Sequence, residues 1–115
     1  MNFLFGRSND AFKKITTQEY HDQFFDPKAA HVLVDVRTTG EYKDGHLPGA
    51  INIPLDKLSA RLKDIPKDKT VVMVCASGNR SASAAKMLTD AGYGDVYNLL
   101  GGTMRWMMSG LPVER

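Results

Sequence analysis

The fold is decided by the stretch Val71-Val72-Met73-Val74-Cys75-Ala76-Ser77-Gly78-Asn79-Arg80-Ser81. Its apolar start predicts a strand buried on both faces, as in a parallel sheet. Small residues and a glycine then form a loop. The Ala- and Ser-rich segment from Arg80 to Ala91 predicts a closely packed helix that ends near Gly92. A buried strand, a short loop and a helix in this order predict one unit of an α/β fold.

The rest of the chain repeats this alternation of strands and helices. The predicted strands cover residues 31–37, 51–53, 70–74 and 95–99. The predicted helices cover residues 17–25, 55–63 and 80–91, with a short last one around Trp106. The first helix begins in a capping box formed by Thr16 and Glu19 and ends before Pro27. We therefore expect an α/β domain with an open, mostly parallel sheet, flanked by helices and joined by right-handed crossovers.

Length and composition fit one globular domain. The chain has 115 residues, of which 43% are hydrophobic and 24% charged, and this composition can form a core without disulfides or metals. We expect a lead-in over residues 1–14 and a single domain over residues 15–113. The net charge of +2 comes without a dense basic tract, so we expect no nucleic-acid partner. A monomer or a weak dimer is expected.

The cysteine and histidine content limits the chemistry. Cys75 is the only cysteine, so an intramolecular disulfide is impossible, and the three histidines do not stand at a metal-binding spacing. No apolar run is long enough to span a membrane, and the first residues lack the order of a signal peptide. We expect a cytoplasmic protein without a metal, in which the lone thiol stays reduced.

The loop after the strand at residues 70–74 carries the candidate chemistry. It places Cys75 at the carboxyl end of a buried strand, before a loop and the N-terminus of a helix. Backbone amides of such a loop can point at one spot, and the helix end adds further unpaired amides. Gly78 permits the necessary backbone angles, the hydroxyls of Ser77 and Ser81 add donors, and Arg80 adds a positive charge. We infer an anion-binding cradle with a sulfur atom at its base.

Such surroundings favour a thiolate. Cysteines at helix N-termini or beside cations titrate at about 3.5–7.5 instead of about 8.5, and the thiolate is the nucleophilic form. The competing interpretation is structural, because a cysteine that ends a buried strand is often only a small apolar core residue. The order strand, Gly-containing loop, arginine and helix favours the functional interpretation of Cys75.

At this point four ordered motifs resemble those of the rhodanese family, in its small single-domain form. They extend from about Ile15 to Pro112. The motifs are Leu33-Val34-Asp35-Val36-Arg37, Glu41-Tyr42 leading into Gly45-His46-Leu47-Pro48-Gly49-Ala50-Ile51-Asn52-Ile53-Pro54, the loop Cys75-Ala76-Ser77-Gly78-Asn79-Arg80-Ser81, and Leu100-Gly101-Gly102 with Trp106. Four motifs in order are far more specific than a cysteine loop alone.

The resemblance implies a thiosulfate sulfurtransferase-type enzyme without a cofactor. Family members take a sulfane sulfur onto the active-site cysteine as a persulfide and then pass it to a thiol or to cyanide. Carried over to this chain, Cys75 is the sulfur carrier, and Arg80 binds the anionic donor or orders the loop. The residues expected to bind substrate are Ala76, Ser77, Gly78, Asn79 and Ser81. Expected partners are a small-molecule sulfur donor and a thiol or cyanide acceptor, with a persulfide-bearing or thioredoxin-like protein among the candidates.

Two alternatives come from other functional classes. Tyrosine phosphatases place five residues between cysteine and arginine, and family members with this longer loop resemble phosphatases and arsenate reductases. Four residues separate Cys75 from Arg80 here. The shorter cradle suits a persulfide better than a phosphate. The second alternative is a sulfur-relay or regulatory binding module with little turnover of its own. Members that use thiosulfate often carry a basic residue after the cysteine, and Ala76 stands there instead, which leaves the natural donor open.

Three further features have structural interpretations. Asp35 and Arg37 lie at the carboxyl end of a strand, and we expect a structural ion pair that supports the loop after it. His46 lies in a Gly- and Pro-containing loop, where we expect it to fix the turn and not to act as a base. Trp106 fits the core and the mouth of the pocket equally well, while Met104, Met107 and Met108 fit the core or a partner surface.

Overall fold

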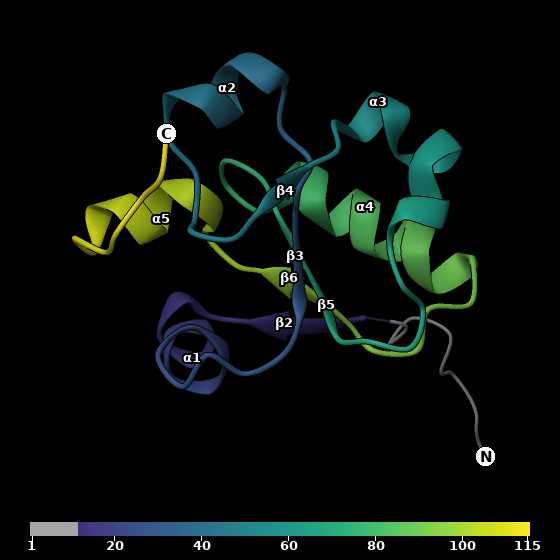
Figure 1. Ribbon diagram of the computed structural model, residues 1–115, viewed down its shortest axis with the longest axis horizontal. Helices are drawn as coiled ribbons and strands as arrows, with labels where there is room; N and C mark the ends of the chain where they lie inside the picture. The colour runs from purple at the N-terminus through teal and green to yellow at the C-terminus, as the bar shows by residue number, and fades with distance from the viewer. Residues whose placement is uncertain (1–11) are drawn as a thin grey trace.

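A parallel sheet runs through the computed structural model, which describes residues 12–115 (Figure 1). Its strands are β2 (Lys13–Ile15), β3 (Val32–Asp35), β4 (Ile51–Asn52), β5 (Val71–Val74) and β6 (Val96–Leu99). The five strands lie in the order β2-β6-β5-β3-β4, and every neighbouring pair is parallel. The predicted α/β fold with an open parallel sheet is therefore confirmed.

Helices connect these strands, and a last helix follows β6. They are α1 (Thr17–Tyr20), continued by the π-helical turn η2 (His21–Phe25), then α2 (Thr39–Asp44), α3 (Leu55–Leu58), continued by the 3-10 segment η3 (Ser59–Asp64), α4 (Asn79–Asp90) and α5 (Gly102–Met108). Among the described residues, none of these helices combines the length and the apolar character that crossing a bilayer requires.

Strand β5 is the centre of the structure. It pairs with β3 on one side and with β6 on the other, and all four of its residues are 0% exposed. Because successive side chains point to opposite faces, Val71 and Met73 join one core and Val72 and Val74 the other. A continuous apolar strand is thus required, as the sequence predicted.

Each face of the sheet has its own helices (Figure 1). Leu58 of α3 and Leu88 of α4 cover the face that includes Val71. Tyr20 of α1 and Trp106 of α5 cover the opposite face, with their rings 5.9 Å apart in an edge-to-face arrangement. The capping box predicted for the first helix is present, with Thr16 and Glu19 bonded to each other's backbone amides.

Several elements differ from the sequence-based expectation. Strand β2 and helix α2 were not predicted, and the helix expected over residues 55–63 changes from α to 3-10 geometry after Leu58. The predicted lead-in lies outside the described residues as far as Ala11, and its last residues, Lys13 and Lys14, belong to β2. Helix α2 has a capping box of its own at Thr38 but no apolar face, and the hydrophobic pattern therefore gave no sign of it.

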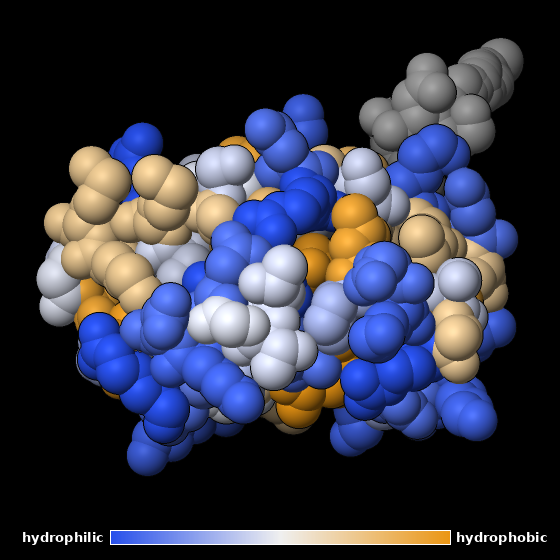
Figure 2. All heavy atoms as spheres, turned by 90° about the horizontal axis from the view of Figure 1, so that it is seen from above, coloured by the Kyte–Doolittle hydropathy of each residue, from blue (hydrophilic) through white to orange (hydrophobic). Residues whose placement is uncertain are grey.

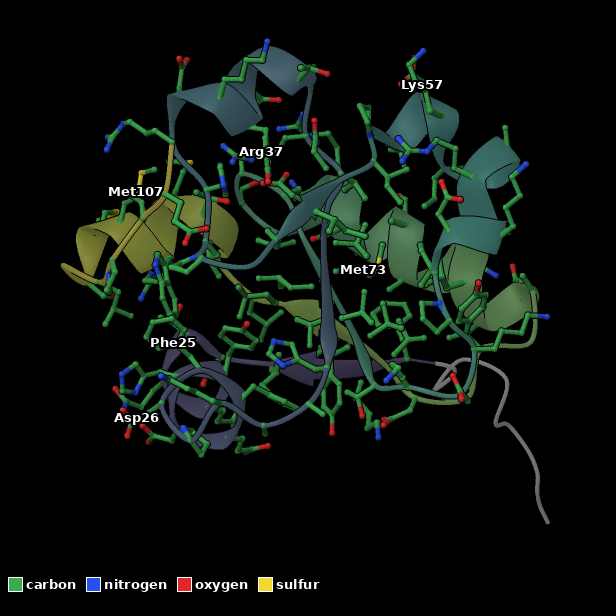
Figure 3. All side chains as sticks on the ribbon, in the orientation of Figure 1. Phe25, Asp26, Arg37, Lys57, Met73 and Met107 are labelled. Atoms are coloured by element: carbon green, nitrogen blue, oxygen red, sulfur yellow. The ribbon has the colours of Figure 1, made fainter. Side chains whose placement is uncertain are left out.

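A buried ion pair holds the loop that follows β3. The carboxylate of Asp35 accepts from the guanidinium of Arg37 at 2.8–3.1 Å and from its backbone amide at 2.9 Å. Arg37 also donates to the carbonyl of Gly45, and Figure 3 shows it below α2 at the upper edge of the sheet. The two side chains are 0% and 7% exposed, and the structural ion pair expected from the sequence is confirmed.

Replacing Asp35→Asn should destabilise the protein strongly, because it leaves the buried Arg37 without a carboxylate. We expect a loss of about 3 kcal/mol in the free energy of unfolding, measured by urea denaturation. Asp90→Asn is the matched control, since its pair with Lys86 is 64–70% exposed and should contribute less than about 1 kcal/mol. Equal losses in the two variants would contradict a structural role for the Asp35–Arg37 pair.

Candidate active site at the Cys75 loop

Cys75 follows the central strand β5 directly and lies at the carboxyl edge of the sheet. Its side chain is buried, with only 1% exposed. The chain then turns into α4 through Gly78, which has a φ of +110° and forms the N-terminal cap of that helix. Residues with a side chain rarely adopt this left-handed backbone conformation. The turn that brings the helix N-terminus over the sulfur therefore requires glycine here.

Two hydrogen bonds reach the sulfur atom. The backbone amide of Gly78 donates to the Sγ of Cys75 at 3.1 Å, and the hydroxyl of Ser81 donates at 3.3 Å. Burial by itself raises the pKa of the Cys75 thiol, but the Ser81 hydroxyl and three loop amides outweigh burial and lower that pKa. The amides belong to Ser77, Gly78 and Ser81. The loop thus stabilises negative charge on the sulfur.

A buried asparagine on β6 holds two of these groups in place. Asn98 is 3% exposed, and its side-chain amide donates to the carbonyl of Gly78. Its oxygen is a second acceptor for the single proton of the Ser81 hydroxyl, which is donated either to Asn98 or to the Cys75 sulfur. This residue was missed in the sequence. The available signal was a polar residue within an otherwise apolar strand, at the edge where parallel sheets place their sites.

Helix α5 supports the loop from the other side. The amide and hydroxyl of Thr103 both donate to the carbonyl of Cys75, at 2.9 and 3.1 Å, and the amide of Met104 donates to the carbonyl of Ala76. This approach needs a glycine before Thr103, because a Cβ on Gly102 would lie 2.4 Å from the Cys75 carbonyl oxygen. The Gly101-Gly102 motif thus serves the cysteine loop directly.

Arg80 is turned toward helix α2. Its two terminal nitrogens donate to the two carboxylate oxygens of Glu41 at 2.8 and 3.0 Å, and both side chains are a little over one third exposed. This contact lowers the pKa of Glu41 to about 2, so the pair is charged throughout the neutral range. Glu41 was noticed only as part of a family motif, and its pairing with Arg80 was not predicted.

The other predicted binding residues occupy different positions. Gly78 and Ser81 contact the sulfur, and the amide of Ser77 contributes to its charge stabilisation. Ser77 and Asn79 are exposed, and Ala76 is half-buried with its carbonyl bound to α5. The binding of substrate by these residues stays a prediction. Within residues 12–115, no cluster of three or more His, Cys, Asp or Glu side chains has the arrangement of a metal site.

His46 and Trp106 both have structural surroundings. The ring of His46 stacks on Tyr42 with centroids 3.7 Å apart, and its backbone pairs with that of Glu114 near the C-terminus. Trp106 is 0% exposed and donates to the carbonyl of Pro112, so it is part of the core and does not line a pocket mouth. The structural interpretation of His46 is confirmed, and the question left open for Trp106 is answered.

The methionines of α5 are on the surface. Met104, Met107 and Met108 are 56%, 39% and 79% exposed. Figure 2 shows moderately hydrophobic side chains gathered on the side of the molecule where α5 lies. These residues therefore do not belong to the core, although Met104 follows directly after the residue that binds the Cys75 carbonyl.

Comparison with known proteins defines the family. The sequence model of the rhodanese-like domain matches residues 16–109. A sulfurtransferase from Allochromatium vinosum is 44% identical over 82 residues, which cover 71% of this chain and 77% of that protein. The crystal structure of a rhodanese-related protein from Thermoplasma volcanium superposes with a TM-score of 0.79 at 32% identity, over 90% of this chain and 98% of that chain.

A second similar structure comes from a Rhodopseudomonas palustris protein of unknown function, described as a possible tyrosine phosphatase. It has a TM-score of 0.80 at 29% identity and covers 93% of this chain and 88% of that one. The extent of the match to the rhodanese-like domain shows that the chain belongs to the rhodanese family, as its four motifs indicated.

Replacing Ser81→Ala should raise the pKa of Cys75, because it removes one of the hydrogen bonds that stabilise the thiolate. The rate of alkylation by iodoacetamide, followed from pH 5 to 10, should show a midpoint at higher pH than in the wild-type protein. Ser83→Ala, on the exposed face of the same helix, is the control and should leave the midpoint unchanged. An unchanged midpoint in Ser81→Ala would contradict the assigned role of the hydroxyl.

Replacing Gly102→Ala should separate α5 from the cysteine loop, since the new methyl group would overlap the backbone of Cys75 and Ala76. We expect a loss of about 2 kcal/mol or more in the free energy of unfolding, because the overlap falls on backbone atoms and the φ of +56° is unfavourable for alanine. Gly94→Ala has open space around its Cβ position and should be nearly neutral. Similar urea midpoints for both variants would contradict this account.

Proposed function

We propose that this protein is a sulfurtransferase in which Cys75 carries a sulfane sulfur as a persulfide. The observation that carries the proposal is the pair of donors aimed at the Cys75 sulfur, the Gly78 amide and the Ser81 hydroxyl. Such donors favour the nucleophilic thiolate and also stabilise the negative charge of an attached sulfur. The likeness to a protein named sulfurtransferase supports the same conclusion.

The first half-reaction loads the enzyme. The Cys75 thiolate attacks the outer sulfur of thiosulfate, the bond between the two sulfur atoms of the donor breaks, and sulfite leaves with the bonding electron pair. The product is a Cys75 persulfide anion, and the total charge is the same on both sides. A persulfide donor reacts in the same way, with a thiolate as the leaving group.

The second half-reaction removes the outer sulfur from the Cys75 persulfide. A thiolate or cyanide attacks the outer sulfur of the persulfide, and Cys75 leaves as a thiolate, which the loop again stabilises. No metal or organic cofactor takes part in either step. A reducing compartment such as the cytoplasm, where a single thiol stays reduced, suits this chemistry, and the acceptor there is a small thiol or the cysteine of another protein.

Replacing Cys75→Ser should reduce the formation of thiocyanate from thiosulfate and cyanide to the uncatalysed rate, because an alcohol at this position cannot carry the sulfur. The variant should keep its fold, because serine retains the backbone carbonyl through which Cys75 contacts α5. Wild-type turnover in that variant would refute Cys75 as the carrier. The assay should be repeated with a persulfide donor, because Ala76 supplies no charge for thiosulfate.

The phosphatase alternative has one observation in its favour, the structural likeness to the Rhodopseudomonas palustris protein. Hydrolysis of para-nitrophenyl phosphate without sulfur transfer would support it. A Cys75 persulfide that forms but does not react with cyanide or small thiols would instead support a relay or binding module.

A further inference from the structure

The charge of Arg80 is already compensated in this protein. Its guanidinium binds Glu41 through two nitrogen atoms, in the forked geometry that is the strongest arrangement of an arginine and a carboxylate. Arg80 is the only charged residue in the loop from Cys75 to Ser81. The loop therefore presents amide and hydroxyl donors to a substrate, but no unpaired cation.

Glu41 is held in this position by its own helix. One of its carboxylate oxygens accepts from the backbone amide of Thr38 at 3.0 Å and from the Thr38 hydroxyl at 3.2 Å, and its amide donates to that hydroxyl. A donor that approaches Arg80 must therefore displace a carboxylate that accepts two further hydrogen bonds in its capping box.

The cavity beside Arg80 contains a further carboxylate. A cavity of about 330 Å³ next to Arg80 is lined by Thr38, Leu55 and Asp56 among others. Arg37, which precedes α2 in the sequence, is already paired with Asp35. Glu41 thus compensates the Arg80 guanidinium, and Asp56 adds a second carboxylate to the lining of the adjacent cavity, which opposes the entry of a substrate with two negative charges.

We propose that Glu41 determines the donor specificity of the Cys75 site, because its pairing with Arg80 disfavours dianionic thiosulfate relative to sulfane donors with one negative charge or none. This inference rests on the proposed sulfurtransferase function. Arg80 belongs to the cysteine loop and directly precedes Ser81, whose hydroxyl reaches the Cys75 sulfur. The Glu41–Arg80 pair therefore sets the charge at the border of the Cys75 site.

The chain offers a matched control for Glu41→Gln. Glu19 occupies the same position in the capping box of α1, where Thr16 replaces Thr38, but it does not contact Arg80. Glutamine is accepted at this capping position, so both variants keep their helix start and lose one charge. Glu19→Gln thus reports the effect of a general change in net charge.

The first measurement compares two donors that differ by one charge. Thiosulfate is a dianion, and methanethiosulfonate is a monoanion that gives up the same outer sulfur and releases methanesulfinate. In Glu41→Gln the ratio of kcat/KM for thiosulfate to that for methanethiosulfonate should rise about two- to fivefold, the size expected for one partly exposed ion pair. The rise should shrink in 1 M KCl because salt screens it, and Glu19→Gln should leave the ratio unchanged.

The second measurement does not depend on sulfur transfer. The alkylation rates of Cys75 with anionic iodoacetate and with neutral iodoacetamide are measured at one pH, and their ratio cancels the thiolate fraction. This ratio should also rise in Glu41→Gln and not in Glu19→Gln. An unchanged alkylation ratio in Glu41→Gln, or an equal rise in Glu19→Gln, would overturn the inference.

The two measurements separate the inference from the function on which it rests. If the wild-type protein and the variants transfer no sulfur from either donor, the proposed function fails, and the alkylation ratio alone decides whether Glu41 controls the charge at Cys75. If sulfur transfer occurs and the donor ratio does not change in Glu41→Gln, the inference fails and the sulfurtransferase function stands.

Discussion

The hydrogen bonds from Gly78 and Ser81 to the Cys75 sulfur are the interaction on which the rest of the site depends. They exist only because β5 ends at the centre of a parallel sheet and α4 begins soon after it, at Asn79, with the left-handed Gly78 as its cap. Around them, Asn98 fixes the Ser81 hydroxyl and the Gly78 carbonyl, and α5 binds the carbonyl of Cys75 itself. The sheet, two helices and a glycine pair therefore converge on one loop.

The electrostatics of the site come from dipoles more than from net charge. Arg80 within the loop is paired with Glu41 at the surface, and Arg37 after β3 is paired with Asp35 in the interior. What remains for a substrate is the set of N–H and O–H groups at the N-terminus of α4, which stabilise charge at short range and cost no reorganisation when the charge develops. Such a site suits a persulfide anion attached to Cys75, whose charge develops at this point.

The sequence predicted those parts of the structure that depend on local patterns. The apolar run before Cys75 identified the central strand, the capping box at Thr16 identified the first helix, and the four motifs identified the family. It did not predict β2 or α2, because a three-residue edge strand and a short polar helix lack a hydrophobic period. The contacts of Asn98 and Glu41 with the loop were also missed, since they join residues 20 and 39 positions apart. Only the tertiary arrangement shows that Arg80 meets a carboxylate.

The most direct test of the central claim is the intact mass of the protein after incubation with a sulfane donor, first thiosulfate and then a small persulfide. If the loop makes Cys75 a sulfur carrier, the wild-type protein gains the mass of one sulfur atom, cyanide removes it, and Cys75→Ser gains none. If neither donor adds sulfur to the wild-type protein, or if Cys75→Ser gains the same mass, the account of this site as a sulfur-carrying cradle is contradicted.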